Sequence, residues 1–178
     1  MQVLHFKLLF VVFCFMGLYC AGLQPNPKYN NGRATKYDEN TDGKIIELDG
    51  DYSTFQRRLI EEVNAFMGVP YRWGGNDHRG MDCSGFVSTV YLNVTGLKLP
   101  RKARSMFKYG HRIGEGDLRM GDLVFFERIE NDGISHVGIY LRKYEFVHAS
   151  TSSGVSTSTL DDDYYRSRFV GARRIYNY

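Results

Sequence analysis

The spacing of apolar residues changes near Gly121, and this change limits the fold more than any other feature of the chain. Before it, apolar residues recur every three or four positions, as on one face of a helix. After it come short segments rich in Val, Ile, Phe and Tyr, which are typical of strands: DLVFFE, SHVGIYLR, EFVHAS and FVGARRI. Helices followed by strands, without alternation, predict an α+β domain in which N-terminal helices pack on a small antiparallel sheet.

Two helices are expected in the first half of the chain. The first runs through STFQRRLIEEVNAFMG, where Ser53 and Gln56 have the spacing of a capping box. The second begins at Cys83, with Asp82 in the N-cap position, and its apolar stripe ends at Gly96. Cys83 is therefore predicted in the first turn of a helix.

Residues 1–20 differ from the rest, because one lysine is followed by the unbroken apolar run LLFVVFCFMGL. This run is too short to span a bilayer comfortably, and it predicts a secretory signal peptide and an exported protein of the periplasm or cell envelope. Cys20 could become the lipid-bearing first residue of a membrane-anchored lipoprotein, although Tyr19 is bulky where such signals carry a small residue. Ordinary cleavage near Ala21 or Gly22 is the alternative.

Residues 21–52 are rich in Asn, Gly and Asp and are predicted to be a linker or tether. Within them, the stretch from Asp38 to Asp49 spaces its acidic side chains as a calcium loop does, but it ends on Asp where Glu is usual. No amphipathic helix precedes it, so the linker is the preferred interpretation. Residues 53–178 are predicted to form the single folded domain.

Composition argues against nucleic-acid binding. The formal charge of +3 is small for 178 residues and gives no basic patch of the kind that nucleic-acid binding needs. A hydrophobic content of 43% with 24% charged residues is typical of a globular body. We expect a monomer without a cofactor and predict no metal site and no nucleic-acid partner.

The cysteines are unevenly placed. Cys14 lies inside the predicted signal peptide and Cys20 at its edge, so only Cys83 belongs to the folded body and no internal disulfide can form. A lone thiol in an oxidising compartment is a liability unless it has a function. A helix N-terminus lowers the pKa of a thiol, so Cys83 is a candidate nucleophile.

A general base for this thiol can come from the predicted strands. His136 and His148 lie in neighbouring strands, and a hairpin that turns around Arg142 places them directly opposite each other on one face. His136 would then take the proton of Cys83, and His148 would hold the other ring nitrogen of His136. The connection LRKYE has no glycine to fix the turn, so the register is one choice among others.

An oxyanion donor is suggested by PYRWGG. Tyr71 follows Pro70 and precedes two glycines, so its hydroxyl is expected to be exposed by a turn. Together with the backbone N–H of Cys83, it could stabilise a developing oxyanion. Singly, each of these residues could be an ordinary packing residue, and their joint occurrence favours a catalytic site.

The motifs PYRWGG, MDCSGFV, LPR, GDLVFF, HVGIYL, FVHAS and RFVGARR occur in the order seen in the NlpC family of cell-wall cysteine peptidases. The resemblance covers the chain from Phe55 to Ile175. It implies a papain-like α+β fold and hydrolysis of peptide bonds in peptidoglycan stem peptides, beside D-glutamate or diaminopimelate. Met120 stands where a proline is frequent, and the hairpin lacks the usual glycine.

The resemblance also implies roles for single residues. Cys83 matches the nucleophile, His136 the base and His148 the orienting third residue. Tyr71 matches the tyrosine on the oxyanion side of the site. Asp82 and Ser84 match positions that bind the free amine of the stem peptide in some members.

Three alternatives to the peptidase remain open. An amidase would cut between muramic acid and L-alanine with the same kind of site. Acyl transfer would use the same thioester but deliver it to an amine. A catalytically silent wall-binding module would have lost Cys83 or His136, and both are present.

Overall fold

A computed structural model describes residues 46–48 and 50–178 of the chain. The predicted signal peptide, Cys20 and most of the predicted tether lie outside this part, as does the Asp38 end of the acidic loop. Within the described part, no helix combines the length and the apolar character that crossing a membrane requires.

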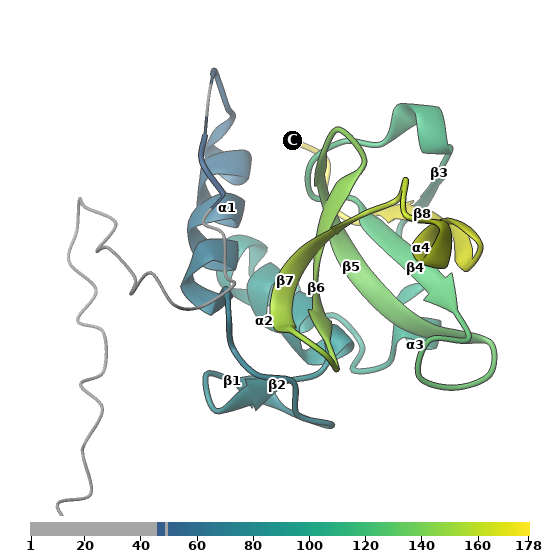
Figure 1. Ribbon diagram of the computed structural model, residues 1–178. Helices are drawn as coiled ribbons and strands as arrows, with labels where there is room; N and C mark the ends of the chain where they lie inside the picture. The colour runs from purple at the N-terminus through teal and green to yellow at the C-terminus, as the bar shows by residue number, and fades with distance from the viewer. Residues whose placement is uncertain (1–45, 49) are drawn as a thin grey trace, which may run out of the picture. The chain divides into compact units, whose positions relative to one another are not determined.

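The order of elements is the predicted one, with the main helices before the strands of the large sheet (Figure 1). The helices are α1 (Thr54–Phe66), α2 (Cys83–Thr95), α3 (Ala103–Met106) and α4 (Asp163–Arg166), with the 3₁₀ turn η1 (Glu115–Asp117). The strands are β1 (Asn76–Asp77), β2 (Gly80–Met81), β3 (His111–Ile113), β4 (Leu123–Glu127), β5 (Ile134–Arg142), β6 (Glu145–Ser150), β7 (Gly154–Thr159) and β8 (Phe169–Arg174). The α+β class predicted from the sequence is confirmed.

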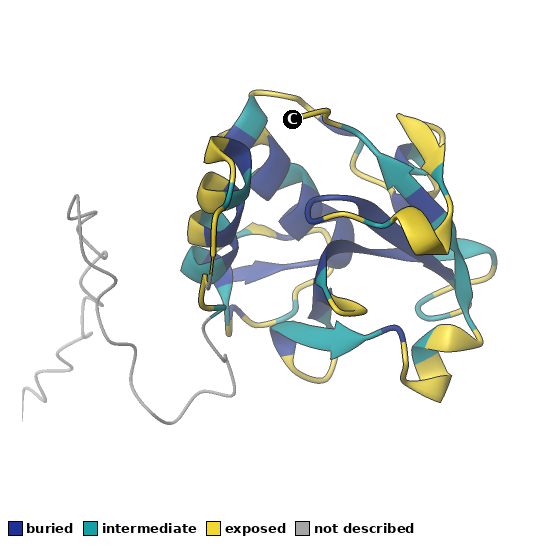
Figure 2. Cartoon of the chain, turned by 90° about the horizontal axis from the view of Figure 1, so that it is seen from above, coloured by how far each residue is buried: buried dark blue, intermediate teal, exposed yellow. Residues whose placement is uncertain are grey.

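The first helix begins at the predicted capping box. The Ser53 hydroxyl accepts from the Gln56 N–H, and the Gln56 side chain accepts from the Ser53 N–H at 2.9 Å. Figure 2 shows that α1 has one buried side and one exposed side, as the helical spacing of its apolar residues requires. The buried side faces α2 and the core through Phe55, Leu59, Ile60, Val63 and Phe66.

The second helix is fixed at both ends. The Asp82 carboxylate accepts from the Gly85 N–H at 2.6 Å, as an N-cap does, and Gly96 ends the helix in the left-handed conformation with φ of 76°. The hydroxyl of the buried Tyr91 donates to the carbonyl of Gly121, which joins α2 to the start of β4. These contacts hold the N-terminus of α2, and with it Cys83, in a fixed position.

The large sheet is antiparallel and has the order β3-β8-β4-β5-β6-β7. The four strands predicted from the sequence form its centre, and the flanking strands β3 and β7 were not predicted. The segment GVSTST of β7 has mostly small hydroxyl side chains, which are as common in loops as in strands. It becomes a strand because all six of its residues pair with β6.

The hairpin register predicted around Arg142 is wrong by two residues. The turn is formed by Lys143 and Tyr144, which both have positive φ, 48° and 65°, as in the two-residue turns that match strand twist. Ile139 then pairs with Val147, and this register continues with His148 beside Gly138 instead of opposite His136. A shift of two residues keeps both histidines on the same face, as predicted.

Gly138 makes this hairpin possible. A Cβ atom there would lie 2.7 Å from a ring carbon of Phe146, 2.9 Å from the Val147 carbonyl oxygen and 3.4 Å from the Cβ of His148. A larger residue would therefore push β6 and the ring of His148 away from β5.

The two faces of the sheet bury different groups of residues. The face toward α1 and α2 carries the main core, with strand residues such as Phe125, Val137 and Ile139 at 0% exposure. The other face carries a smaller aromatic cluster around Phe126 and Phe146, covered by Leu160 and by Tyr165 of α4. By strand alternation, His136 and His148 belong to this second face.

The last residues of the predicted tether contact the domain. Asn64 of α1 exchanges hydrogen bonds with the backbone N–H and carbonyl of Ile46, at 2.9 and 3.0 Å. Tyr52 packs against the main core, and its hydroxyl accepts from Arg142 at 3.2 Å. The described residues before 53 are thus attached to the folded body.

Candidate active site

Cys83 is the first residue of α2 and is 3% exposed. Its thiol donates to the carbonyl of Ser135, with Sγ 3.8 Å from the oxygen, at the start of β5. The ladder between β4 and β5 shifts register at this point, so that Phe126 pairs with His136 and Glu127 with Ile134. The bulge brings the beginning of β5 to the N-terminus of α2.

The carboxylate of Asp82 is held by several donors. It accepts from the backbone N–H groups of Gly74, at 2.8 Å, and Gly85, and from the Ser84 hydroxyl at 2.9 Å. The guanidinium of Arg101 donates to both of its oxygens, at 3.0 and 3.1 Å. Burial would raise the pKa of Asp82, but these hydrogen bonds, with that of Arg101 the strongest, hold the pKa below its ordinary value.

These contacts place Asp82 and Ser84 beside the nucleophile but turned into the fold. Both are buried, and both carboxylate oxygens of Asp82 already have partners. Binding of a substrate amine by this pair stays a prediction. In this structure, Asp82 and Arg101 hold two segments in place: the loop that contains Gly74 and the first turn of α2.

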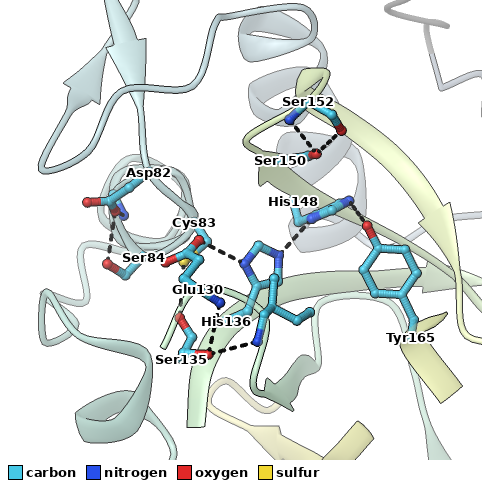
Figure 3. A network of polar contacts seen from close by, with 12 residues as sticks. Asp82, Cys83, Ser84, Glu130, Ser135, His136, His148, Ser150, Ser152 and Tyr165 are labelled. Atoms are coloured by element: carbon cyan, nitrogen blue, oxygen red, sulfur yellow. Dashed lines mark hydrogen bonds and ion pairs between the residues drawn. The ribbon is translucent and has the colours of Figure 1, made fainter. Parts of the chain in front are cut away.

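The two histidines form a chain of hydrogen bonds. Nε2 of His136 lies 2.7 Å from Nδ1 of His148, and Nε2 of His148 lies 3.0 Å from the Ser158 hydroxyl. Tyr165 also approaches Nε2 of His148, at 3.4 Å (Figure 3). Burial, reinforced by the neighbouring His136, lowers the pKa of His148 well below its ordinary value, so His148 is neutral.

A neutral His148 sets the roles of the ring nitrogens. If Nε2–H of His148 donates to Ser158, its Nδ1 accepts the proton of His136 Nε2. Nδ1 of His136 then faces the other way, toward Cys83 and Glu130. This chain of hydrogen bonds orients the ring of His136 so that its Nδ1 can exchange a proton with the thiol of Cys83.

Glu130 was not predicted, and it lies at the centre of the site (Figure 3). Its Oε1 is 3.2 Å from Nδ1 of His136, and its side chain is 9% exposed. The closest ligand atoms of Cys83, Glu130 and His136 all lie within 4.8 Å of one another. Glu130 belongs to the loop between β4 and β5, and no periodic pattern marks a loop residue of this kind.

The β4–β5 loop is held in place by neighbouring groups. The backbone N–H groups of Ile129 and Glu130 donate to the Ser135 hydroxyl, at 3.3 and 3.4 Å. Arg104 of α3 donates to the carbonyl of Asp132 at 3.0 Å. The carboxylate of Glu130 is thus positioned by the backbone and not only by its contact with His136.

The hydroxyl of Tyr71 is buried, and its neighbouring acceptor is the carboxylate of Glu130. Burial raises the pKa of Tyr71, and the nearby charges of Glu130 and Cys83 raise it further. Tyr71 therefore keeps its proton and remains available as a donor next to the thiol.

The charge state of Cys83 differs from the sequence prediction. The helix N-terminus was expected to lower the pKa of the thiol, but burial raises this pKa well above its ordinary value. The carboxylates of Glu130 and Asp82 raise it further, and the Val137 N–H opposes them only in part. The thiol is protonated in this structure, because desolvation and two anions outweigh the helix dipole.

Comparison with known proteins identifies the family of this chain. A model of the NlpC/P60 family matches residues 68–174. The chain belongs to the NlpC/P60 family. The match covers every strand of the large sheet and all of the residues around Cys83 described above.

Individual relatives are similar over the same region. The probable endopeptidase NlpC of Escherichia coli K12 is 43% identical over 117 residues, which cover 66% of this chain and 76% of that protein. The murein DD-endopeptidase MepS/murein LD-carboxypeptidase of the same organism is 42% identical over 118 residues, covering 66% of this chain and 62% of that protein. This chain thus matches less than two thirds of the second relative.

A solved structure gives the same picture of the fold. An NLP/P60 family protein of Staphylococcus aureus Mu50, described as similar to a lipoprotein, superimposes with a TM-score of 0.65 at 32% identity. The superposition covers 77% of this chain and 46% of that chain. The papain-like α+β architecture predicted from the resemblance is confirmed at the level of the fold.

The NlpC/P60 domain has a pocket of about 290 Å³ next to the histidine pair. Glu130 and His136 form the end nearest Cys83, and Ser150, Ser152 and Tyr164 form other parts of the wall. Asp162 adds a second carboxylate. The lining therefore combines hydroxyl groups, aromatic rings and negative charge, which suits a polar ligand with an amino group.

Proposed function

We propose that this protein is a peptidoglycan hydrolase that cleaves peptide bonds in cell-wall stem peptides through the thiol of Cys83. The observation that supports it most is the hydrogen-bonded chain from Ser158 through His148 to His136, which directs Nδ1 of His136 toward the thiol at the start of α2. The name of one relative, a murein DD-endopeptidase, supports this substrate class.

The reaction follows from the positions of these groups. Nδ1 of His136 takes the thiol proton, and the thiolate of Cys83 attacks the amide carbonyl. The hydroxyl of Tyr71 and the backbone N–H of Cys83 donate to the oxyanion of the tetrahedral intermediate. The proton on His136 passes to the leaving amine, and a thioester forms.

Water completes the cycle. Nδ1 of His136 removes a proton from the water molecule that attacks the thioester, and the acid product leaves as the thiolate is protonated again. His148 keeps the ring of His136 in one orientation throughout, because its Nδ1 accepts from Nε2 of His136.

Substrate binding has to displace Glu130. Its carboxylate contacts Nδ1 of His136, the atom that must accept the thiol proton, and Cys83 is buried. A substrate that enters from the side of the β4–β5 loop would move this carboxylate away. Loss of the nearby negative charge would also favour the thiolate.

We further propose that the protein acts outside the cytoplasm, with residues 1–20 as its signal peptide. Cell fractionation tests export, and metabolic labelling with a fatty acid tests lipidation at Cys20. Label in the wild type that disappears in Cys20→Ser would show a lipid anchor. A soluble, unlabelled mature chain that begins near Ala21 or Gly22 would show ordinary cleavage instead.

The bond that is cut identifies the activity. Defined muropeptides are digested with the full-length protein, and the new termini are identified by mass spectrometry. A new amine inside the stem peptide is expected for the peptidase. A free L-alanine amine would instead indicate the amidase, and an added amine captured in the product would indicate acyl transfer. Binding without any cleavage would indicate a wall-binding module.

A further inference from the structure

We propose that the catalytic centre is also an inhibitory zinc site, formed by Sγ of Cys83, a carboxylate oxygen of Glu130 and Nδ1 of His136. These three atoms come from α2, the β4–β5 loop and β5, and all lie within 4.8 Å of one another. Among the described residues, no other group of three histidine, cysteine or acidic side chains converges in this way. No metal site was predicted from the sequence, because Glu130 gave no signal there.

The distances suit a tetrahedral ion. Zinc bonds of about 2.0–2.3 Å to nitrogen, oxygen and sulfur place neighbouring ligand atoms roughly 3.4–3.6 Å apart. Oε1 of Glu130 and Nδ1 of His136 are already 3.2 Å apart, and the sulfur needs to approach by no more than about 1.4 Å. Small side-chain rotations are enough to close the site.

The ligand set selects zinc over other common ions. One thiolate, one imidazole and one carboxylate are borderline ligands that zinc accepts readily. Calcium and magnesium prefer oxygen ligands alone, and copper(I) prefers several sulfur ligands. Three protein ligands leave a fourth position for water, and the hydroxyl of Tyr71, which lies beside Glu130 and Cys83, could donate a hydrogen bond to that water.

The surrounding contacts hold the ligands in place. His148 fixes the ring of His136 through Nε2, which is the outer contact that metal-binding histidines usually have. The backbone of Glu130 is held by the Ser135 hydroxyl. In the metal-free protein Oε1 of Glu130 and Nδ1 of His136 are already at hydrogen-bond distance, 3.2 Å. On binding, zinc replaces the thiol proton and any proton shared by this pair, and these protons go to solvent.

The consequence for catalysis rests on the proposed function. A sulfur bound to zinc cannot attack a carbonyl, and Nδ1 of His136 cannot accept a proton while it is bound to the ion. Zinc would also tie the β4–β5 loop to α2, which keeps the substrate out. The bound ion therefore switches hydrolysis off, and a chelator restores it.

Zinc binding is tested without any substrate. The full-length protein is incubated over a series of free zinc concentrations set by a chelator buffer. It is then treated with iodoacetamide, and the alkylated peptide that contains Cys83 is quantified by mass spectrometry. Zinc is expected to protect Cys83, and Glu130→Gln is expected to need at least about tenfold more zinc for half-protection, as loss of a metal contact requires.

Glu127→Gln is the matched control. Glu127 precedes the same loop but is only partly buried and pairs with Arg128 at 2.6 Å, so its loss should leave the zinc concentration for half-protection unchanged. Circular dichroism first checks that each variant is folded. Equal protection of the wild type and Glu130→Gln would overturn the three-ligand site, as would a lack of protection in the wild type.

Cobalt gives a second readout that does not depend on the Glu130 variant. Cobalt(II) bound by a thiolate has a charge-transfer absorption in the near ultraviolet. This band is expected in the wild type and absent from Cys83→Ser, which retains Cys14 and Cys20. A band of equal strength in both proteins would refute the site. Because neither readout uses hydrolysis, the zinc site and the proposed peptidase can fail independently.

Discussion

At the scale of single residues, the site is determined by the balance of charges around Cys83. The sulfur lies at a helix N-terminus, which favours the thiolate, but it is buried beside Glu130 and Asp82, which favour the thiol. The second effect is the larger one in this structure. Activation therefore requires a change at Glu130, because Asp82 is tied to Arg101.

Replacing Glu130 by Gln tests this balance. The amide removes one negative charge next to the sulfur while keeping the size of the side chain, so the pKa of Cys83 should fall. Alkylation by the uncharged reagent iodoacetamide at neutral pH should become roughly tenfold faster, and the pH profile should move to lower pH. Stopped samples analysed by mass give the rate.

Glu127→Gln is again the control, and its alkylation rate should equal that of the wild type. A Glu130→Gln rate equal to the wild-type rate over the whole pH range would mean that the Glu130 charge does not govern the thiol.

At the scale of elements, the N-terminus of α2 contributes both to the stability of the domain and to the geometry of the site. The N-cap carboxylate of Asp82 holds the Gly74 loop, the first turn of α2 and Arg101 together. Tyr71, the proposed oxyanion donor, lies just before this loop and is bridged to Met81 next to Asp82. The same carboxylate thus positions the nucleophile and the segment that carries the donor.

Asp82→Asn should lower the free energy of unfolding by about 2 kcal/mol, as expected for loss of hydrogen bonds to a charged group. The pKa of Asp82 is lower in the folded protein than its ordinary value of 3.8. Its contribution is therefore fully present above pH 3.8 and is lost as the pH falls through the folded pKa. Urea unfolding of both proteins at neutral pH and near pH 3 measures the difference.

The difference in the free energy of unfolding between the wild type and Asp82→Asn should be largest at neutral pH and should become smaller in acid. A difference in the free energy of unfolding that is the same at both pH values would show that the charge of Asp82 does not contribute to stability. Only the geometry of its hydrogen bonds would then matter.

At the scale of the whole molecule, local sequence patterns predict the structural elements that depend on residues close together in the sequence. The capping box of Ser53, the N-cap of Asp82 and the central strands were all predicted, because each depends on residues close in sequence. The shared face of His136 and His148 was also predicted, since face depends only on odd or even spacing. The exact register was not, because Lys143 and Tyr144 form a two-residue turn without glycine.

Features with distant causes were missed. β7 is a strand only because β6 is beside it, and Glu130 enters the site only because Ser135 and Arg104 hold its loop. The high pKa of Cys83 likewise depends on burial by segments far apart in the chain.

The most direct measurement is the rate at which Cys83→Ala releases stem-peptide fragments from a defined muropeptide, next to the wild type and His136→Ala. Loss of the nucleophile or of its base should lower the rate by at least about a thousandfold, since Cys83 is the only thiol among the described residues and His136 is the base beside it. Both variants should keep the circular dichroism spectrum of the wild type. A Cys83→Ala protein that releases the same fragments within about tenfold of the wild-type rate would contradict the account.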